Sequence, residues 1–170
     1  MEEIKQETIE LVVVNGEIYG AKQYKWDMRF LNLAKEISSW SKDTSTKVGS
    51  VLVGPHRNIL TTGYNGLPRG ADDSNASRLE RPEKYFWFEH AERNAIYNAA
   101  RTGVGLQGST AYSTLCPCMD CARAFIQSGV SRVVTYDYRT SSKANDPKWC
   151  EQHLKAVTLF KECGVELALY

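Results

Sequence analysis

Two short groups of residues carry side chains that could bind a metal and transfer a proton. A His-Ala-Glu group begins at His90, and a Pro-Cys-Met-Asp-Cys group begins at Pro117. One imidazole and two thiols, from His90, Cys118 and Cys121, make three ligands of the kind that zinc prefers. Three protein ligands leave the fourth tetrahedral position open for water, which is typical of catalytic zinc and not of structural zinc. The sequence therefore predicts a catalytic zinc site.

The spacing within each group predicts which side chains face the metal. Cys118 and Cys121 are three residues apart at the start of an expected helix, so their sulfurs share one face of it. The unpaired amides and the dipole of that helix end lower thiol pKa values and favour thiolates. His90 and Glu92 are two residues apart on another expected helix and should diverge. We expect His90 to reach the zinc and Glu92 to reach the substrate and the attacking water.

A Cys-x-x-Cys pair taken alone also occurs in zinc ribbons and in redox-active dithiols. A zinc ribbon needs a second close pair of ligands, and none is present elsewhere in the sequence. A thioredoxin-like dithiol does not require His90 or Glu92. The two groups together favour the catalytic interpretation over both alternatives.

Length and composition agree with a single domain that works in a reducing compartment. The chain has 170 residues, 42% of them hydrophobic, and a formal net charge of +1 without a basic stripe, so we expect no nucleic-acid partner. No apolar run reaches membrane-spanning length, and the first ten residues are polar and acidic, unlike a signal peptide. Five cysteines, three of them between Cys116 and Cys121, suit metal binding in the cytoplasm better than a disulfide framework.

Strands and helices alternate along the chain after an N-terminal hairpin. The hairpin covers residues 8–20 around an Asn15-Gly16 turn signal. The other expected elements, in chain order, are a helix over 25–40, strands over 47–53 and 58–64, an irregular segment over 65–86, a helix over 89–101, a strand over 109–115, a helix over 118–128, a strand over 131–136, a polar loop over 137–147, a helix over 148–163 and a strand over 165–169. Helices between the later strands imply parallel pairing there, so we predict an α/β protein with a three-layer α/β/α sandwich around a mixed sheet.

From about Trp26 to its C-terminus, the chain resembles the zinc-dependent cytidine/deoxycytidylate deaminase superfamily. The H-x-E group followed by the P-C-x-x-C group carries the resemblance. Three further segments are similar to the deoxycytidylate (dCMP) deaminase branch: Ser45–Gly49, the Gly-Tyr-Asn-Gly-Leu-Pro-Arg-Gly loop Gly63–Gly70, and His90–Ile96. The resemblance implies a mixed five-stranded sheet of the cytidine deaminase type within a domain over 25–170, and it leaves 1–24 as an N-terminal β-hairpin extension.

The resemblance also implies an activity, the zinc-dependent hydrolytic deamination of dCMP. One zinc ion held by His90, Cys118 and Cys121 would activate water, and Glu92 would carry protons to ring N3 and to the leaving ammonia. The product in this branch is dUMP, which supplies thymidylate synthesis. The open alternatives are deamination of another cytosine nucleotide, of a nucleoside or of a polynucleotide, and a zinc-stabilised module that senses dNTPs without catalysis.

Substrate contacts are implied in the same way. Asn65 matches a residue that hydrogen-bonds the sugar and the base, although an Asn in Asn-Gly is also a common turn residue. Ser45, Thr46 and Lys47 match contacts to the 5′-phosphate, and Tyr138 matches a position near the same phosphate. Polar residues are common in such loops, so both interpretations stay open for these four residues.

Regulation between subunits is a further implication. Relatives in this branch are often dimers or hexamers that dCTP with Mg²⁺ activates and dTTP inhibits. The positions of this chain that match the effector site are Gly66, Leu67, Arg69, Gly70 and Arg101. Arg101 could equally interact with the dipole at the end of its helix. The resemblance thus implies a dimer-based homo-oligomer, up to a hexamer, with an effector site.

Many relatives bind a second, structural zinc near the long loop, and this chain lacks the usual ligands for it. It has no cysteine before Cys116 and only two histidines besides His90. We expect a single zinc ion, with the irregular segment ordered by ion pairs instead. The residues expected to form these pairs are Arg78, Glu80, Arg81 and Glu83.

Overall fold

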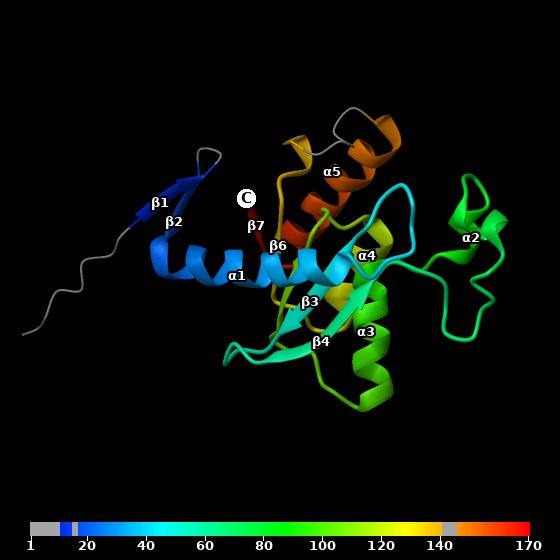
Figure 1. Ribbon diagram of the computed structural model, residues 1–170. Helices are drawn as coiled ribbons and strands as arrows, with labels where there is room; N and C mark the ends of the chain where they lie inside the picture. The colour runs from blue at the N-terminus through cyan, green and yellow to red at the C-terminus, as the bar shows by residue number, and fades with distance from the viewer. Residues whose placement is uncertain (1–10, 15–16, 141–145) are drawn as a thin grey trace, which may run out of the picture.

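A five-stranded sheet forms the centre of the protein. The computed structural model describes residues 11–14, 17–140 and 146–170, and its strand order is β4-β3-β5-β6-β7 (Figure 1). β3 pairs antiparallel with β4 and with β5, whereas β5, β6 and β7 run parallel. The prediction of a mixed sheet with parallel later strands is confirmed. The strands are β3 (Gly49–Val53), β4 (Ile59–Tyr64), β5 (Thr110–Ser113), β6 (Arg132–Thr135) and β7 (Glu166–Leu169).

Helices cover both faces of this sheet. α1 (Ala21–Ser38) lies on one face, and α3 (Ala91–Thr102), α4 (Met119–Gln127) and α5 (Pro147–Glu162) lie on the other. α4 connects β5 to β6 and α5 connects β6 to β7, since parallel neighbours need a long crossover. The three-layer α/β/α prediction is confirmed. None of the helices in the described ranges is long and apolar enough to cross a membrane.

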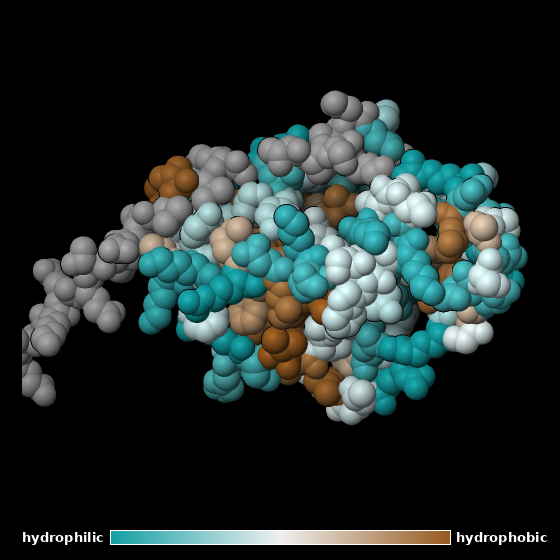
Figure 2. All heavy atoms as spheres, viewed as in Figure 1, coloured by the Kyte–Doolittle hydropathy of each residue, from teal (hydrophilic) through white to brown (hydrophobic). Residues whose placement is uncertain are grey.

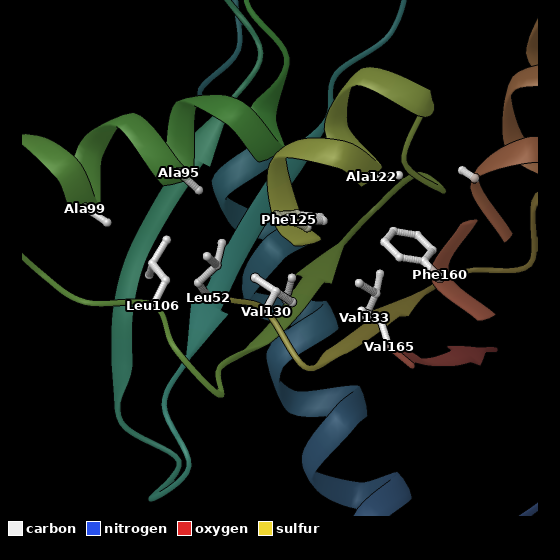
Figure 3. Close-up of a cluster of buried hydrophobic side chains, with 12 residues drawn as sticks. Leu52, Ala95, Ala99, Leu106, Ala122, Phe125, Val130, Val133, Phe160 and Val165 are labelled. Carbon is white, nitrogen blue, oxygen red and sulfur yellow. The ribbon is translucent and has the colours of Figure 1, made fainter. Parts of the chain in front are cut away.

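The hydrophobic core has two halves because side chains alternate along the strands. On β3, Val51 and Val53 belong to the half under α1, whereas Leu52 belongs to the half on the other face. Figure 3 shows this second half, in which Leu52 lies among side chains that include Ala95 of α3 and Phe125 of α4. The helices that carry the predicted zinc ligands are therefore fixed by the second half of the core.

Close packing fixes α3 against the edge strand β4. A Cβ atom added to Gly63 of β4 would lie 2.3 Å from the carbonyl oxygen of Ala91 and 2.4 Å from the amide nitrogen of Ala95. Cβ atoms essentially never approach other atoms so closely, so only glycine fits at this position. The contact holds the first turn of α3, which carries Glu92, at a defined height above the sheet.

The N-terminal hairpin is separate from the central sheet. β1 (Leu11–Val14) and β2 (Glu17–Gly20) pair antiparallel in a two-stranded sheet of their own (Figure 1). The predicted turn at 15–16 lies outside the described residues. α1 begins directly after β2, earlier than the predicted start at 25, because Ala21 and the polar residues after it are good helix formers. The predicted boundary between 24 and 25 therefore falls inside α1.

The long segment between β4 and α3 is more ordered than the sequence predicted. It contains a 3-10 turn, η1 (Ala76–Leu79), and a short helix, α2 (Lys84–Trp87). Its two ends meet in an isolated β-bridge between Gly66 and Glu89. The segment thus leaves the sheet and returns to it as a closed loop (Figure 1).

The predicted ion pairs within this segment are not formed in the described part of the chain. The guanidinium of Arg78 instead lies over the ring of Trp87, 4.1 Å from its centroid. Glu83 accepts a 2.8 Å hydrogen bond from Trp87 Nε1. The prediction was wrong because the aromatic residues that follow Lys84 offer nearby partners to the charged side chains.

Candidate active site

Two helix N-termini meet at the predicted zinc ligands. His90 immediately precedes α3 and Cys118 immediately precedes α4, both with extended backbone at φ/ψ of −75°/151° and −73°/173°. Cys121 follows in the first turn of α4. The structure brings the three side chains together, with their ligand atoms within 4.8 Å of one another. Among the described residues, this is the one such group of His, Cys, Asp or Glu side chains.

The separations of the ligand atoms fit a zinc ion. His90 Nδ1 lies 3.5 Å from Cys118 Sγ and 3.4 Å from Cys121 Sγ. A tetrahedral ion with Zn–N of about 2.0 Å and Zn–S of about 2.3 Å holds such atoms about 3.5 Å apart. One imidazole and two thiolates also suit the preference of zinc for nitrogen and sulfur. The donor set and its geometry therefore both fit zinc.

Local electrostatics favour the thiolate form of Cys118. Hydrogen bonding with Cys121 and with His90 lowers the pKa of Cys118 to about 4, against the opposing effect of burial. The free amides at the N-terminus of α4 act in the same direction. Cys118 is therefore a thiolate at neutral pH, which is the form that binds zinc.

Glu92 lies beside the ligand set but is not part of it. It is the second residue of α3, it is only 4% exposed, and Ser113 Oγ of β5 donates a 3.4 Å hydrogen bond to Glu92 Oε1. Burial raises the pKa of Glu92, and the neighbouring His90 opposes part of this shift. A carboxylate with a raised pKa can both accept and return a proton near neutral pH. Glu92 thus has the environment of a proton-transfer group.

One pocket contains Glu92 and part of the ligand set. It combines two buried carboxylates, two basic side chains and several aromatic rings, a mixture that can hold a polar ligand by a few directed contacts. Its lining residues are Asp43, Thr46, Val48, Asn65, Arg81, Lys84, Tyr85, Phe88, His90, Ala91, Glu92, Leu115, Cys116, Cys118 and Trp149.

Asn65 is buried in the wall of this pocket, where its amide holds the chain before β3. Asn65 Oδ1 accepts a 2.8 Å hydrogen bond from the amide of Val48. Asn65 Nδ2 donates to the carbonyl oxygen of Thr46 at 2.9 Å and to Asp43 Oδ2 at 3.2 Å. Asn65 therefore fixes the loop that leads into β3, in addition to lining the pocket.

The four predicted phosphate contacts lie in different surroundings. Thr46 lines the pocket, whereas Ser45, Lys47 and Tyr138 do not. Ser45 Oγ donates a 2.9 Å hydrogen bond to a carboxylate oxygen of Asp43, and Lys47 Nζ reaches a backbone carbonyl at 3.2 Å. The ring of Tyr138 packs edge-on against a buried histidine of α5, with ring centroids 5.6 Å apart. Of the four, Thr46 alone is placed in the pocket wall.

Sequence reasoning missed Asp43 and Lys84, which connect two walls of the pocket. Lys84 Nζ donates to both carboxylate oxygens of Asp43, at 2.9 and 2.7 Å, with side chains 6% and 4% exposed. Asp43 also accepts hydrogen bonds from the amides of Ser45 and Thr46. An Asp two residues before a Ser is a turn signal that could have pointed to Asp43, whereas no local signal marks Lys84.

Trp149 of α5 was also missed, although it lines the pocket next to a metal ligand. Its ring centroid lies 6.3 Å from that of His90, with the ring planes at 40°. Its position at the start of a long amphipathic helix indicated only core packing. It places an aromatic face beside the ligand set.

The predicted effector residues divide between a second pocket and the nearby surface. We call this second pocket the α3–β4 hollow; Gly66, Leu67 and Arg69 line it, together with Tyr64, Asn94 and Asn98. Arg69 Nη2 donates a 2.6 Å hydrogen bond to Asn98 Oδ1. Gly70, with φ of 84°, and the exposed Arg101 do not line it. The hollow thus contains three of the five predicted residues.

Comparison with known proteins agrees with the zinc site that the geometry indicates. The family model of the cytidine and deoxycytidylate deaminase zinc-binding region matches residues 24–137. An uncharacterized deaminase of Aliivibrio fischeri is 38% identical over 143 residues, which cover 84% of this chain and 92% of the relative. The deoxycytidylate deaminase of Enterobacteria phage T2 is 33% identical over 179 residues, covering 81% of this chain and 88% of the relative.

A solved structure shares the fold. The crystal structure of dCMP deaminase from the cyanophage S-TIM5, in complex with dCMP and dUMP, aligns with a TM-score of 0.66 and 24% sequence identity, covering 89% of this chain and 100% of that one. The likeness shows that the two proteins share the same α/β fold. Through its family match, its curated relatives and its His-Cys-Cys site, this chain belongs to the cytidine and deoxycytidylate deaminase family.

Proposed function

We propose that this protein is a zinc-dependent hydrolase that deaminates dCMP to dUMP and ammonia. The proposal rests on one pocket that combines two members of a zinc-type ligand set, a buried carboxylate with a raised pKa, and polar and basic wall residues. Relatives named deoxycytidylate deaminase, and the cyanophage enzyme crystallised with dCMP and dUMP, support dCMP as the substrate. The dUMP formed would supply thymidylate synthesis in the cytoplasm.

Zinc and Glu92 divide the chemistry between them. His90, Cys118 and Cys121 would hold a zinc ion, which would lower the pKa of water to about 7 and so supply a nucleophile at neutral pH. Glu92 would accept a proton from the attacking water and deliver it to N3 of the cytosine ring. It would then take the proton of the hydroxyl group added at C4 and pass it to the amino group, so that the C4–N bond breaks, the C4 carbonyl forms and ammonia leaves. Its burial keeps other water away from these transfers.

The substrate contacts are proposed from the pocket wall. Asn65, which is buried there, would orient the sugar and the base through the acceptor capacity that its carbonyl oxygen retains. Thr46 would contact the 5′-phosphate. Ser45, Lys47 and Tyr138 stay predictions as phosphate contacts, since they lie near the pocket and do not line it.

Regulation by dCTP and dTTP between subunits is the finer part of the proposal. The α3–β4 hollow is lined by backbone and amide groups that suit a nucleotide. Along the same edge strand, β4, Ile59 and Tyr64 are 51% and 40% exposed, and Tyr97 of α3 is 48% exposed. Figure 2 shows hydrophobic side chains on the viewed face below α1, over β4. An exposed apolar edge of this kind supports a dimer-based oligomer with the hollow at the interface.

Ammonia release tests the proposed substrate directly. The zinc-loaded protein would be assayed with dCMP, CMP, deoxycytidine and single-stranded DNA, and zinc content would be measured in the same preparation. We expect one zinc ion per chain and the highest kcat/KM with dCMP. Addition of dCTP with Mg²⁺ should raise the activity and dTTP should lower it, with the oligomeric state followed by light scattering.

The possible outcomes of this assay distinguish the proposed function from its alternatives. Turnover of another substrate in place of dCMP would replace the substrate assignment and keep the deaminase. Zinc binding without turnover of any substrate would favour the zinc-stabilised dNTP-sensing module. A rate that is indifferent to dCTP and dTTP would remove the effector proposal alone.

A further inference from the structure

Two basic side chains line the active-site pocket, and the charge of one of them is cancelled. Lys84 Nζ donates to both carboxylate oxygens of Asp43 within a nearly buried ion pair. Burial alone would raise the pKa of Asp43, but hydrogen bonds from Lys84, Ser45 and Thr46 outweigh it and lower that pKa. Asp43 is therefore ionised at neutral pH and neutralises Lys84.

Arg81 is the other basic side chain in the pocket wall, and its charge is not cancelled. It is exposed, and within the described part of the chain no carboxylate lies at ion-pair distance from it. The remaining carboxylate of the wall, Glu92, lies beside the metal ligands. The pocket thus has a positive charge at Arg81 that is available to an anionic ligand.

The backbone that carries Arg81 is held in place by the same buried ion pair. The amide of Lys84 donates a 2.8 Å hydrogen bond to the carbonyl oxygen of Glu80, so residues 80–84 form one turn. Lys84 at the end of this turn is fixed by Asp43. Arg81 therefore extends from an anchored turn at the pocket, which reduces the entropy lost when its guanidinium binds a ligand.

We propose that Arg81 binds the 5′-phosphate of the substrate and sets the preference for nucleotides over nucleosides. A guanidinium can donate two parallel hydrogen bonds to one phosphate, and the hydroxyl of Thr46 offers a further donor in the same wall. This inference rests on the proposed function, because it places a cytosine nucleotide in this pocket. Arg81 thus binds a ligand, whereas its place in the sequence predicted an ion pair within the segment.

Equilibrium binding of the product and of its phosphate-free analogue tests this role. Calorimetry with dUMP and with deoxyuridine would compare the wild-type holoenzyme with Arg81→Gln. We expect Arg81→Gln to weaken dUMP binding by about 10- to 100-fold, the range of one hydrogen-bonded contact to a charged group, and to leave deoxyuridine binding unchanged. Arg81→Lys should recover part of the loss, because lysine keeps the charge without the paired donors.

The matched control is Lys161→Gln, which removes one positive charge from an exposed position of α5 outside the pocket. It should leave the binding of both ligands unchanged. Because Arg81 is exposed, Arg81→Gln should keep the thermal midpoint of the wild type, and circular dichroism would check this. Unchanged dUMP binding in Arg81→Gln, or equal weakening of both ligands, would overturn the assignment.

The rate of dCMP deamination distinguishes this inference from the function on which it rests. If the wild type binds dUMP through Arg81 but does not deaminate dCMP, the proposed function fails and the phosphate contact remains. If Arg81→Gln deaminates dCMP as fast as the wild type at low substrate, the phosphate contact fails and the function remains. A wild type that binds dUMP no better than deoxyuridine would exclude a phosphate site altogether.

Discussion

His90 and Glu92 are two residues apart at the start of α3, yet only His90 belongs to the metal-ligand set. Glu92 is held by Ser113 Oγ, so an amide in its place keeps the same shape and a similar hydrogen bond. General acid–base groups contribute about 10²- to 10⁴-fold to a rate. In the proposed reaction Glu92 serves two proton transfers, so Glu92→Gln should lower kcat for dCMP by at least about 10³-fold. Ammonia release measures this effect, and mass spectrometry should still find one zinc ion per chain.

Cys121→Ser provides the opposite control for Glu92→Gln. Cys121 is a fully buried member of the ligand set, so its replacement should lower the zinc content as well as the rate. Loss of zinc from Glu92→Gln would mean that the carboxylate is a ligand after all. Retention of near-normal activity in Glu92→Gln would exclude its role as the proton carrier.

The zinc ligands and Glu92 could be predicted because they belong to two short segments, in each of which the important residues are close together in the sequence. His90 and Cys118 directly precede helices whose starts are marked by short-range signals, and the metal chemistry restricts the residue types. Asp43 and Lys84 could not be predicted as a pair, since 41 residues separate them. Charged residues in loops are usually solvated, and these two become buried only because the segment after β4 folds back over the pocket.

Between elements, one buried carboxylate connects α1 to three strands of the sheet. Asp27 of α1 is fully buried, and its two oxygens accept hydrogen bonds from Arg132 of β6, Tyr112 of β5 and Tyr170 after β7. Burial alone would raise the pKa of Asp27, but the bonds from Arg132 and Tyr170 outweigh it and lower that pKa. The charge of Asp27 is therefore a source of stability at neutral pH.

Replacement of this carboxylate should destabilise the fold in a way that depends on pH. Asp27→Asn removes one partner of a buried ion pair and should lower the free energy of unfolding by about 3 kcal/mol at pH 7. The folded pKa of Asp27 lies below its unfolded value of about 3.9. The contribution is thus complete above pH of about 4 and is lost as pH falls through the folded pKa. Urea denaturation from pH 7 to pH 3 should show the difference between wild type and variant shrinking below pH of about 4.

The control for Asp27→Asn lies on the same helix. Glu36→Gln changes an exposed carboxylate of α1 and should alter the free energy of unfolding by less than about 0.5 kcal/mol at every pH. A difference for Asp27→Asn that stays constant down to pH 3 would indicate lost packing and not lost charge.

The order of the helices and strands was predictable, whereas the long-range contacts that hold them together were not. Apolar periodicity and Gly-rich turns located the strands and helices of the three layers, because those signals act within a few residues, but they missed the short helix α2. The bonds from Asp27 to Arg132 and Tyr170 span 105 and 143 residues, and nothing in the sequence near Asp27 marks it as buried. A lone Asp on an amphipathic helix usually faces solvent.

For the molecule as a whole, the position of the ligands means that a bound metal would stabilise the fold. The ligands come from the N-termini of α3 and α4, which also pack against each other over the same half of the core. A zinc ion bound there would therefore connect two of the three helices that cover this face of the sheet. Anything that binds the folded state and not the unfolded state stabilises the fold, by about 4 kcal/mol when its free concentration is 1,000 times Kd.

Removal of zinc should accordingly lower the thermal midpoint of the whole protein. A loss of about 4 kcal/mol in a chain of this size corresponds to a decrease of roughly 10 °C. Calorimetric scans before and after chelation measure it, and added zinc should restore the midpoint, because the ligands lie at ordered helix starts. Glu92→Gln should show the same decrease, whereas Cys121→Ser should begin near the zinc-free midpoint and respond weakly to the chelator. Equal midpoints with and without zinc would mean that the core alone fixes α3 and α4, and that the metal serves the reaction and not the fold.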